Sequence, residues 1–140
     1  MRRWPLTLSD PVDRSRVLAR RSVRQAAFSA SGLVKGDHIV DPRTGDPARG
    51  RRAAWVAVPR PPAAGSSARG GERPRAAAVA DGLTTAFMLM GLGEIEALCE
   101  QNPGLEAWVL PEPADGETGE ASLVHVGGPG SGYTSASSAV

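Results

Sequence analysis

Runs of apolar residues along the chain predict two helices and a set of short strands. Apolar side chains recur at helical spacing from Ala76 to Met90, and Gly91 is a natural residue to end that helix. A second helix is expected from about Gly93 to Gln101, because the residues that follow, Asn102-Pro103-Gly104, favour a turn. Short apolar runs between turn residues predict strands over Trp4 to Leu8, Ala53 to Val58, Leu105 to Leu110 and Glu120 to Val126.

Two further segments complete the pattern. The segment from Arg16 to Ser31 fits either a strand with an arginine-decorated face or a helix, because two rows of alternate residues interleave in it: Val17, Ala19, Arg21 and Val23, and Leu18, Arg20, Ser22 and Arg24. The run from His38 to Val40 is strand-like and leads into a rigid turn, in which Pro42 restricts φ and Gly45 can adopt the positive φ that closes the turn. Together the elements predict an α+β fold with two helices packed on a small mixed or antiparallel sheet.

The composition is that of one domain with many turns. The chain has 140 residues, of which 41% are hydrophobic and 4% aromatic, and its 17 glycines and 12 prolines favour loops. Residues 59–75, rich in Pro, Gly, Ser and Arg, are expected to form a flexible segment, which is more often a tolerated surface loop than a lid. Residues 127–140 are expected to be a disordered Gly/Ser/Ala-rich tail, which leaves residues 1–126 as the domain.

Charge and cysteine content narrow the function classes. The formal net charge of +1 calls for neither nucleic acid nor an anionic membrane as a partner. Cys99 is the only cysteine, which excludes an internal disulfide and a cysteine metal cluster and favours a buried, inert thiol. His125 lies inside a predicted strand and is expected to be structural. No signal peptide or transmembrane segment is visible in the sequence, so a cytoplasmic location is expected.

The turn after the strand-like run carries the first candidate chemistry. It holds a histidine, a carboxylate and a guanidinium close together, those of His38, Asp41 and Arg43. Spacing alone favours an ordinary strand-ending turn over a functional loop.

The helix that follows carries the second candidate. Asp81 and Thr85 are four residues apart, so their side chains project from one helix face and supply two hard oxygen ligands of the kind that Mg²⁺ prefers. Asp81 could equally cap a helix, and Thr85 could bond back to a backbone carbonyl. Thr84 is adjacent but points about 100° away from Thr85, so it is not included.

The two stretches, HIVDPRTG at residues 38–45 and ADGLTTA at residues 80–86, together resemble the C-terminal half of the FAD:protein FMN transferases, the ApbE family. A further segment, SASG, is similar to the Ala-Thr-Ser-Gly signature at the end of a strand in that family. Ser31 and Gly32 match the signature, and Ala30 replaces its threonine. The resemblance favours strands over a helix between Arg16 and Ser31. It also implies that the hairpin which usually follows is shortened here, and that the flexible segment 59–75 is an insertion.

The resemblance implies a transferase that uses FAD as substrate and Mg²⁺ as cofactor. In the family, the residues that match Asp81 and Thr85 bind the divalent metal that bridges the FAD pyrophosphate. A Thr or Ser hydroxyl of a target flavoprotein attacks the FMN-side phosphorus, AMP leaves, and FMN remains joined through a phosphoester. The family's histidine matches His38, which is the candidate catalytic base or orienting group.

The remaining site candidates are cofactor-binding residues. Ile39 and Val40 match residues that line part of the flavin pocket in the family. Asp41 could orient the histidine or support the metal shell, and Arg43 could reach a phosphate or pair with a nearby carboxylate. Ser31 belongs to the matching strand end.

The resemblance covers roughly Trp4 to Val126, which corresponds to only the C-terminal half of the usual family protein. The other half, with a Gly-Gly-Ile-Ala-Lys-Gly-type signature and a third metal ligand, is not part of this sequence. The chain is therefore interpreted as a fragment, as the partner of a separately encoded half, or as a relative that no longer transfers flavin. Besides the target flavoprotein, the expected partner is a separately encoded N-terminal half or a second copy of the chain in a homo-oligomer. The alternative function is a non-catalytic module of the same fold that pairs with another polypeptide through a sheet edge or the 59–75 loop. A phosphate-binding domain of unrelated fold would require both motif matches to be coincidences.

Overall fold

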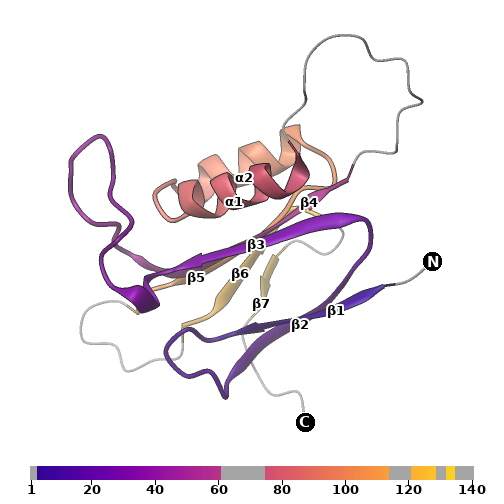
Figure 1. Ribbon diagram of the computed structural model, residues 1–140, viewed down its shortest axis with the longest axis horizontal. Helices are drawn as coiled ribbons and strands as arrows, with labels where there is room; N and C mark the ends of the chain where they lie inside the picture. Colours follow the sequence, from indigo (N-terminus) through magenta and orange to yellow (C-terminus); the bar gives the residue numbers. More distant parts are fainter. Residues whose placement is uncertain (1–2, 61–74, 114–120, 129–131, 135–140) are drawn as a thin grey trace.

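The computed structural model describes residues 3–60, 75–113, 121–128 and 132–134. These residues form a two-stranded sheet, a five-stranded sheet and two helices (Figure 1). Every pair of neighbouring strands in both sheets is antiparallel. The α+β class predicted from the sequence is confirmed, and none of the described helices is long and apolar enough to span a membrane.

The seven described strands and two helices follow one another in a simple order. The strands are β1 (Trp4–Ser9), β2 (Val17–Val23), β3 (Ala26–Gly32), β4 (Arg51–Pro59), β5 (Glu106–Pro111), β6 (Leu123–Val126) and β7 (Gly132–Thr134). The helices are α1 (Ala76–Phe87) and α2 (Leu92–Gln101), and a single 3-10 turn, η1 (Leu33–Lys35), follows β3. Strands β1 and β2 form a hairpin, and the other five form a sheet in the order β3-β4-β5-β6-β7.

The five-stranded sheet is the middle of three layers. Figure 1 shows α1 and α2 on one of its faces and the β1–β2 hairpin on the other. Alternate residues of a strand point to opposite faces, so Ala54 and Val56 of β4 join the apolar core under the helices. Ala53 and Trp55 join the second core under the hairpin. Burial on both faces explains why β4 reads as a continuous apolar run rather than an alternating one.

The structure resolves the two open points of the strand pattern. The segment from Arg16 to Ser31 forms two strands rather than a helix, separated by a turn in which Gln25 has a φ of 48°. The run from His38 to Val40 is not a regular strand: Val40 makes only an isolated bridge with Pro47.

The first helix is shorter than predicted. It ends at Phe87 rather than Met90, and Gly91 precedes α2 instead of ending α1. The Gly91 N–H donates to the Glu94 carboxylate at 2.6 Å, which satisfies one of the unpaired amides at the start of α2.

The segments expected to be irregular lie mostly outside the described residues. Of the expected insertion at 59–75, Pro59 ends strand β4, Arg60 and Arg75 are described, and residues 61–74 lie outside the described residues. Within the expected disordered tail, Gly132–Thr134 instead forms strand β7, because its backbone pairs with the outer edge of β6.

Candidate functional site

Polar side chains of β3 and α1 meet along the outer edge of the sheet. Ser31 Oγ donates to Thr84 Oγ1 at 2.9 Å and lies 3.4 Å from Thr85 Oγ1. Ser29 Oγ donates to an Asp81 carboxylate oxygen at 3.4 Å. We call these five residues the oxygen cluster. The fold therefore brings Ser31 together with Asp81 and Thr85, three residues that the sequence singled out from distant segments.

The position of Asp81 within α1 decides between its alternative roles. The helix begins at Ala76, and its N-cap residue is Arg75, so Asp81 lies in the middle of the helix and does not cap it. Asp81 is exposed on α1, and its carboxylate accepts from Ser29 of the neighbouring strand.

The two threonines have different environments. Thr84 is fully buried, and its hydroxyl donates to the Asp81 carbonyl at 2.8 Å while it accepts from Ser31. Thr85 is exposed, and its Oγ1 lies 3.5 Å from the same carbonyl. Thr84 was left out by the sequence reasoning, but it falls in the buried row that continues from Ala80, four residues earlier. That spacing was the available signal that Thr84 anchors α1 to β3.

The oxygen cluster has the donor chemistry of a partial magnesium site. Among the described residues, no three His, Cys, Asp or Glu side chains gather to hold a metal ion. A cation here would instead take the Asp81 carboxylate and the Thr85 hydroxyl, with water or phosphate oxygens completing its shell. Mg²⁺ commonly binds in this way, through one or two carboxylates plus substrate phosphates. The residues present therefore fit Mg²⁺.

The loop between β3 and β4 contains an ion pair between two residues of the same turn, Asp41 and Arg43. Arg43 donates to both carboxylate oxygens of Asp41, with Nη2 at 2.8 Å from Oδ2 and Nε at 3.0 Å from Oδ1. Hydrogen bonds from Arg43 lower the pKa of Asp41, and the same pairing raises the pKa of the Arg43 guanidinium. Gly45, with a φ of 80°, donates its N–H to the Asp41 carbonyl at 2.8 Å. Of the two partners considered for Arg43, the structure shows the carboxylate, and Asp41 faces Arg43 rather than His38.

His38 lies at the rim of a hollow beside the end of β3. Its Nδ1 is 2.9 Å from the Gly36 carbonyl oxygen, which can only accept, so Nδ1 carries the proton. In the neutral ring with this tautomer, Nε2 carries the lone pair. The hollow, of about 360 Å³, is also lined by Ser31, Lys35 and Trp55.

The two residues after His38 point in different directions. Ile39 is 6% exposed and packs in the core under the helices. Val40 is 48% exposed. The Ile39 side chain is therefore not available to line a ligand pocket in this arrangement, whereas that of Val40 is accessible.

The hollow and the oxygen cluster lie on different sides of β3. The hollow is bounded by Ala53 and Trp55, which belong to the hairpin-side core, and Asp81 and Thr85 do not line it. Ser31 belongs to both sets. The structure thus groups Asp81 with Thr85 and does not bring His38 to them.

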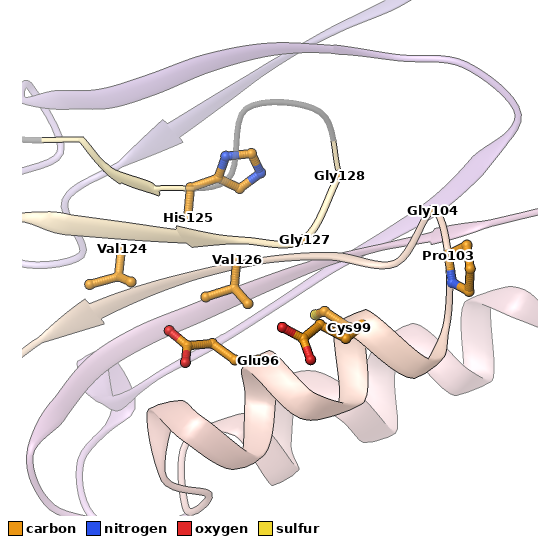
Figure 2. Close-up of a pocket in the computed structure, with 10 residues that line it drawn as sticks. Glu96, Cys99, Pro103, Gly104, Val124, His125, Val126, Gly127 and Gly128 are labelled. Atoms are coloured by element: carbon orange, nitrogen blue, oxygen red, sulfur yellow. The ribbon is translucent and has the colours of Figure 1, made fainter.

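A second groove, of about 500 Å³, lies between α2 and the end of β6 (Figure 2). Its floor includes Val124, Val126 and Cys99, and burial raises the pKa of the Cys99 thiol to about 11, which agrees with the expected inert thiol. Figure 2 shows the His125 ring on the opposite side of β6 from Cys99.

The environment of His125 is that of a structural residue. Its ring stacks on Trp108 with the centroids 4.9 Å apart, and its Nε2 lies 3.1 Å from a carboxylate oxygen of Glu106. His125 is 4% exposed. This environment agrees with the structural role expected from the sequence.

Comparison with known proteins returns no assignment: no protein-family model matches the chain, and no curated protein matches it. The likeness to flavin transferases therefore rests on the residues of the two motif stretches and of the β3 end.

Proposed function

We propose that this chain contributes the magnesium and pyrophosphate ligands of an FAD:protein FMN transferase, which moves FMN from FAD to a Thr or Ser hydroxyl of a target flavoprotein. One observation carries the proposal. Asp81 and Thr85, which match the metal-binding residues of the family that the sequence resembles, lie exposed on one face of α1 above Ser31.

The chemistry of this reaction needs positioning and charge neutralisation more than covalent catalysis. Mg²⁺ would neutralise the pyrophosphate charge. The acceptor hydroxyl oxygen bonds to the FMN-side phosphorus, the bond from that phosphorus to the AMP oxygen breaks, and the hydroxyl proton passes to a base. The Nε2 lone pair of His38 is available for that proton.

The free outer edge of β3 explains how one substrate could contact both groups. Asp81 and Thr85 lie on the helix side of this strand, and His38 lies on the hairpin side near Ser31. Because no described strand pairs with the outer edge of β3, an extended dinucleotide can cross the edge and reach both sides.

The described residues do not form an enclosed site for the isoalloxazine ring. Ile39 is buried in the core, and the hollow beside His38 is open. The proposal therefore assigns the ring to residues of another polypeptide. A separately encoded half would satisfy this requirement.

Isothermal titration of the chain with FAD, with and without Mg²⁺, tests the proposal. Binding by the unchanged chain is expected to require Mg²⁺, to vanish in Asp81→Ala, and to weaken by about tenfold or more in Thr85→Val. The matched control is Glu96→Ala, which removes an exposed carboxylate from the other helix and should leave binding unchanged. Equal FAD binding by the unchanged chain and by Asp81→Ala would refute the proposal.

Replacing Thr84 and Thr85 one at a time distinguishes a metal-ligand role of a threonine from a structural role. Thr84→Val removes a buried hydroxyl with two hydrogen bonds and should lower the free energy of unfolding by about 1–3 kcal/mol. Thr85→Val should change it by less than about 0.5 kcal/mol, because that side chain is exposed. Urea unfolding measures both, and equal destabilisation would mean that Thr85 serves the fold rather than the metal.

A further inference from the structure

In the part of the chain that the structure describes, the outer edge of β3 is open to another strand. Among the described residues, no strand pairs with this edge, since β3 is the first strand of the five-stranded sheet. The pairing of β3 with β4 is regular from Ala26 to Gly32, without a bulge. The strand contains no charged residue and no proline, whereas monomeric proteins usually protect an edge with charges, proline or a bulge. An edge of this kind is a template for pairing with a further strand.

We propose that this edge pairs with the same edge of a second copy of the chain, in a symmetric dimer whose two-fold axis passes beside Ser29. Ser29 is the central residue of the seven in β3. Antiparallel pairing about it places Ala26 opposite Gly32 of the second copy and Ala27 opposite Ser31. Every pair then joins small or uncharged side chains, so the edge is complementary to itself, as a two-fold interface requires. This proposal does not depend on flavin transfer.

The position of α1 is compatible with this pairing. The helix packs on both β3 and β4, and neighbouring strands lie about 4.8 Å apart. In each copy, α1 lies above the boundary between β3 and β4, about half a strand spacing inside β3. With the two β3 strands one spacing apart, the two α1 axes are about 10 Å apart, at the upper end of the range at which helices pack. The helix row nearest the edge is Ala77, Asp81 and Thr85, three exposed residues with short side chains. Short side chains allow the two helices to approach without clashing.

The charge at the two-fold axis makes the dimer sensitive to Asp81. Asp81 contacts Ser29 at 3.4 Å, so pairing about Ser29 brings the carboxylates of the two copies close to each other. Two carboxylates at short separation repel each other, and a divalent cation between them would relieve the repulsion. The paired edges also cover the oxygen cluster, so the dimer and the proposed flavin complex exclude each other.

Sedimentation velocity over a range of protein concentrations tests the pairing. The unchanged chain is expected to show a concentration-dependent dimer that Mg²⁺ strengthens. Ala30→Lys places a charge on an exposed position in the middle of the edge and should weaken association by at least about tenfold. Its matched control is Ser22→Lys, at an exposed position of the hairpin, which should associate like the unchanged chain. Asp81→Asn should associate more tightly, because it removes the repulsion.

Cysteine cross-linking tests the register. Antiparallel pairs have Cα atoms about 4.5–5.5 Å apart, within the range that a disulfide spans, so Ser29→Cys should form a covalent dimer under mild oxidation. Ser22→Cys and the unchanged chain, whose own thiol is the buried Cys99, should remain monomeric on a denaturing gel. A chain that sediments as a monomer at all concentrations, or an Ala30→Lys variant that associates as the unchanged chain does, would overturn the proposal. Failure of Ser29→Cys to cross-link in a dimer would overturn the Ser29 axis.

Discussion

Asp10 links the hairpin to the five-stranded sheet, and its replacement should destabilise the fold measurably. The residue is 2% exposed and begins the turn between β1 and β2. Its Oδ1 accepts from the N–H groups of Val12 at 2.8 Å and Asp13 at 3.3 Å. Its Oδ2 lies 3.5 Å from a guanidinium nitrogen of Arg16 and 3.9 Å from one of Arg52, on β4. The Asp10 carboxylate thus binds backbone amides of the turn, Arg16 beside the hairpin and Arg52 of the five-stranded sheet.

The expected loss of stability follows from how deeply Asp10 and its two arginine partners are buried. Removing one member of a fully buried ion pair typically costs about 3–5 kcal/mol. Here the side chains of Arg16 and Arg52 are 22% and 29% exposed, so water compensates part of the loss. Asp10→Ala should therefore lower the free energy of unfolding by about 2–3 kcal/mol. Asp10→Asn keeps the acceptor for the turn amides and loses only the charge, so about 1–2 kcal/mol is expected.

Urea unfolding monitored by tryptophan fluorescence measures these differences, because Trp55 and Trp108 lie in the core under the hairpin. Asp46→Asn is the control, since Asp46 is an exposed acidic residue elsewhere in the chain. Its effect should stay within about 0.5 kcal/mol. If Asp10→Ala destabilised the chain no more than Asp46→Asn, the carboxylate would not connect the layers as argued.

Three further predictions concern individual groups. Arg43→Ala should raise the pKa of Asp41 towards its usual range in an NMR titration. Because the ion pair lowers the Asp41 pKa in the folded chain, it stabilises the fold at pH values above the pKa of Asp41 in the unfolded chain. This stabilisation is lost as the pH falls through the pKa of Asp41 in the folded chain. Iodoacetamide at pH 8 should modify Cys99 only in the unfolded chain. The folded chain keeps this thiol neutral, and the resulting stabilisation should be lost as the pH rises from the usual thiol pKa of 9.0 through the folded-state pKa of about 11. Gly128→Ala should destabilise the fold by about 1–3 kcal/mol, because φ is +70° and a Cβ would lie 2.5 Å from a carboxyl carbon. Gly93→Ala, on an open helix surface, should stabilise it by about 0.4–1 kcal/mol, and thermal unfolding compares these two variants.

Local periodicity was sufficient to predict both helices and most strands, but not every boundary. The residues after Phe87 remain apolar although α1 has ended, so the sequence pattern continued to Met90 while the backbone turned. Strand β7 was missed because Gly132–Thr134 lies in a Gly/Ser/Ala-rich segment whose composition is typical of a disordered tail. Its pairing depends on the free edge of β6, which only the tertiary structure supplies.

The candidate site was predictable only where its geometry is local. Helical spacing correctly placed Asp81 and Thr85 on one face, because residues four apart are neighbours on any helix. The pairing of Arg43 with Asp41, two residues away, was one of two alternatives that the turn allowed. The burial of Ile39 could not be read from the loop sequence, since it depends on how residues 36–50 fold against the helices.

Asp81→Asn separates the two proposals for the β3 edge, because they predict opposite changes from one substitution. A ligand role requires the negative charge, so the amide should weaken Mg²⁺-dependent FAD binding. Edge pairing brings two such charges together, so the amide should tighten self-association and remove its dependence on Mg²⁺. The fold itself should be little affected, since the Asp81 carboxylate lies on an exposed helix face and its contact with Ser29 is long, at 3.4 Å. Loss of FAD binding without a change in association would support the flavin role alone, and tighter association without any FAD effect would support pairing alone. A variant that unfolded more readily by more than about 1 kcal/mol would instead show that the Ser29–Asp81 contact holds α1 on the sheet.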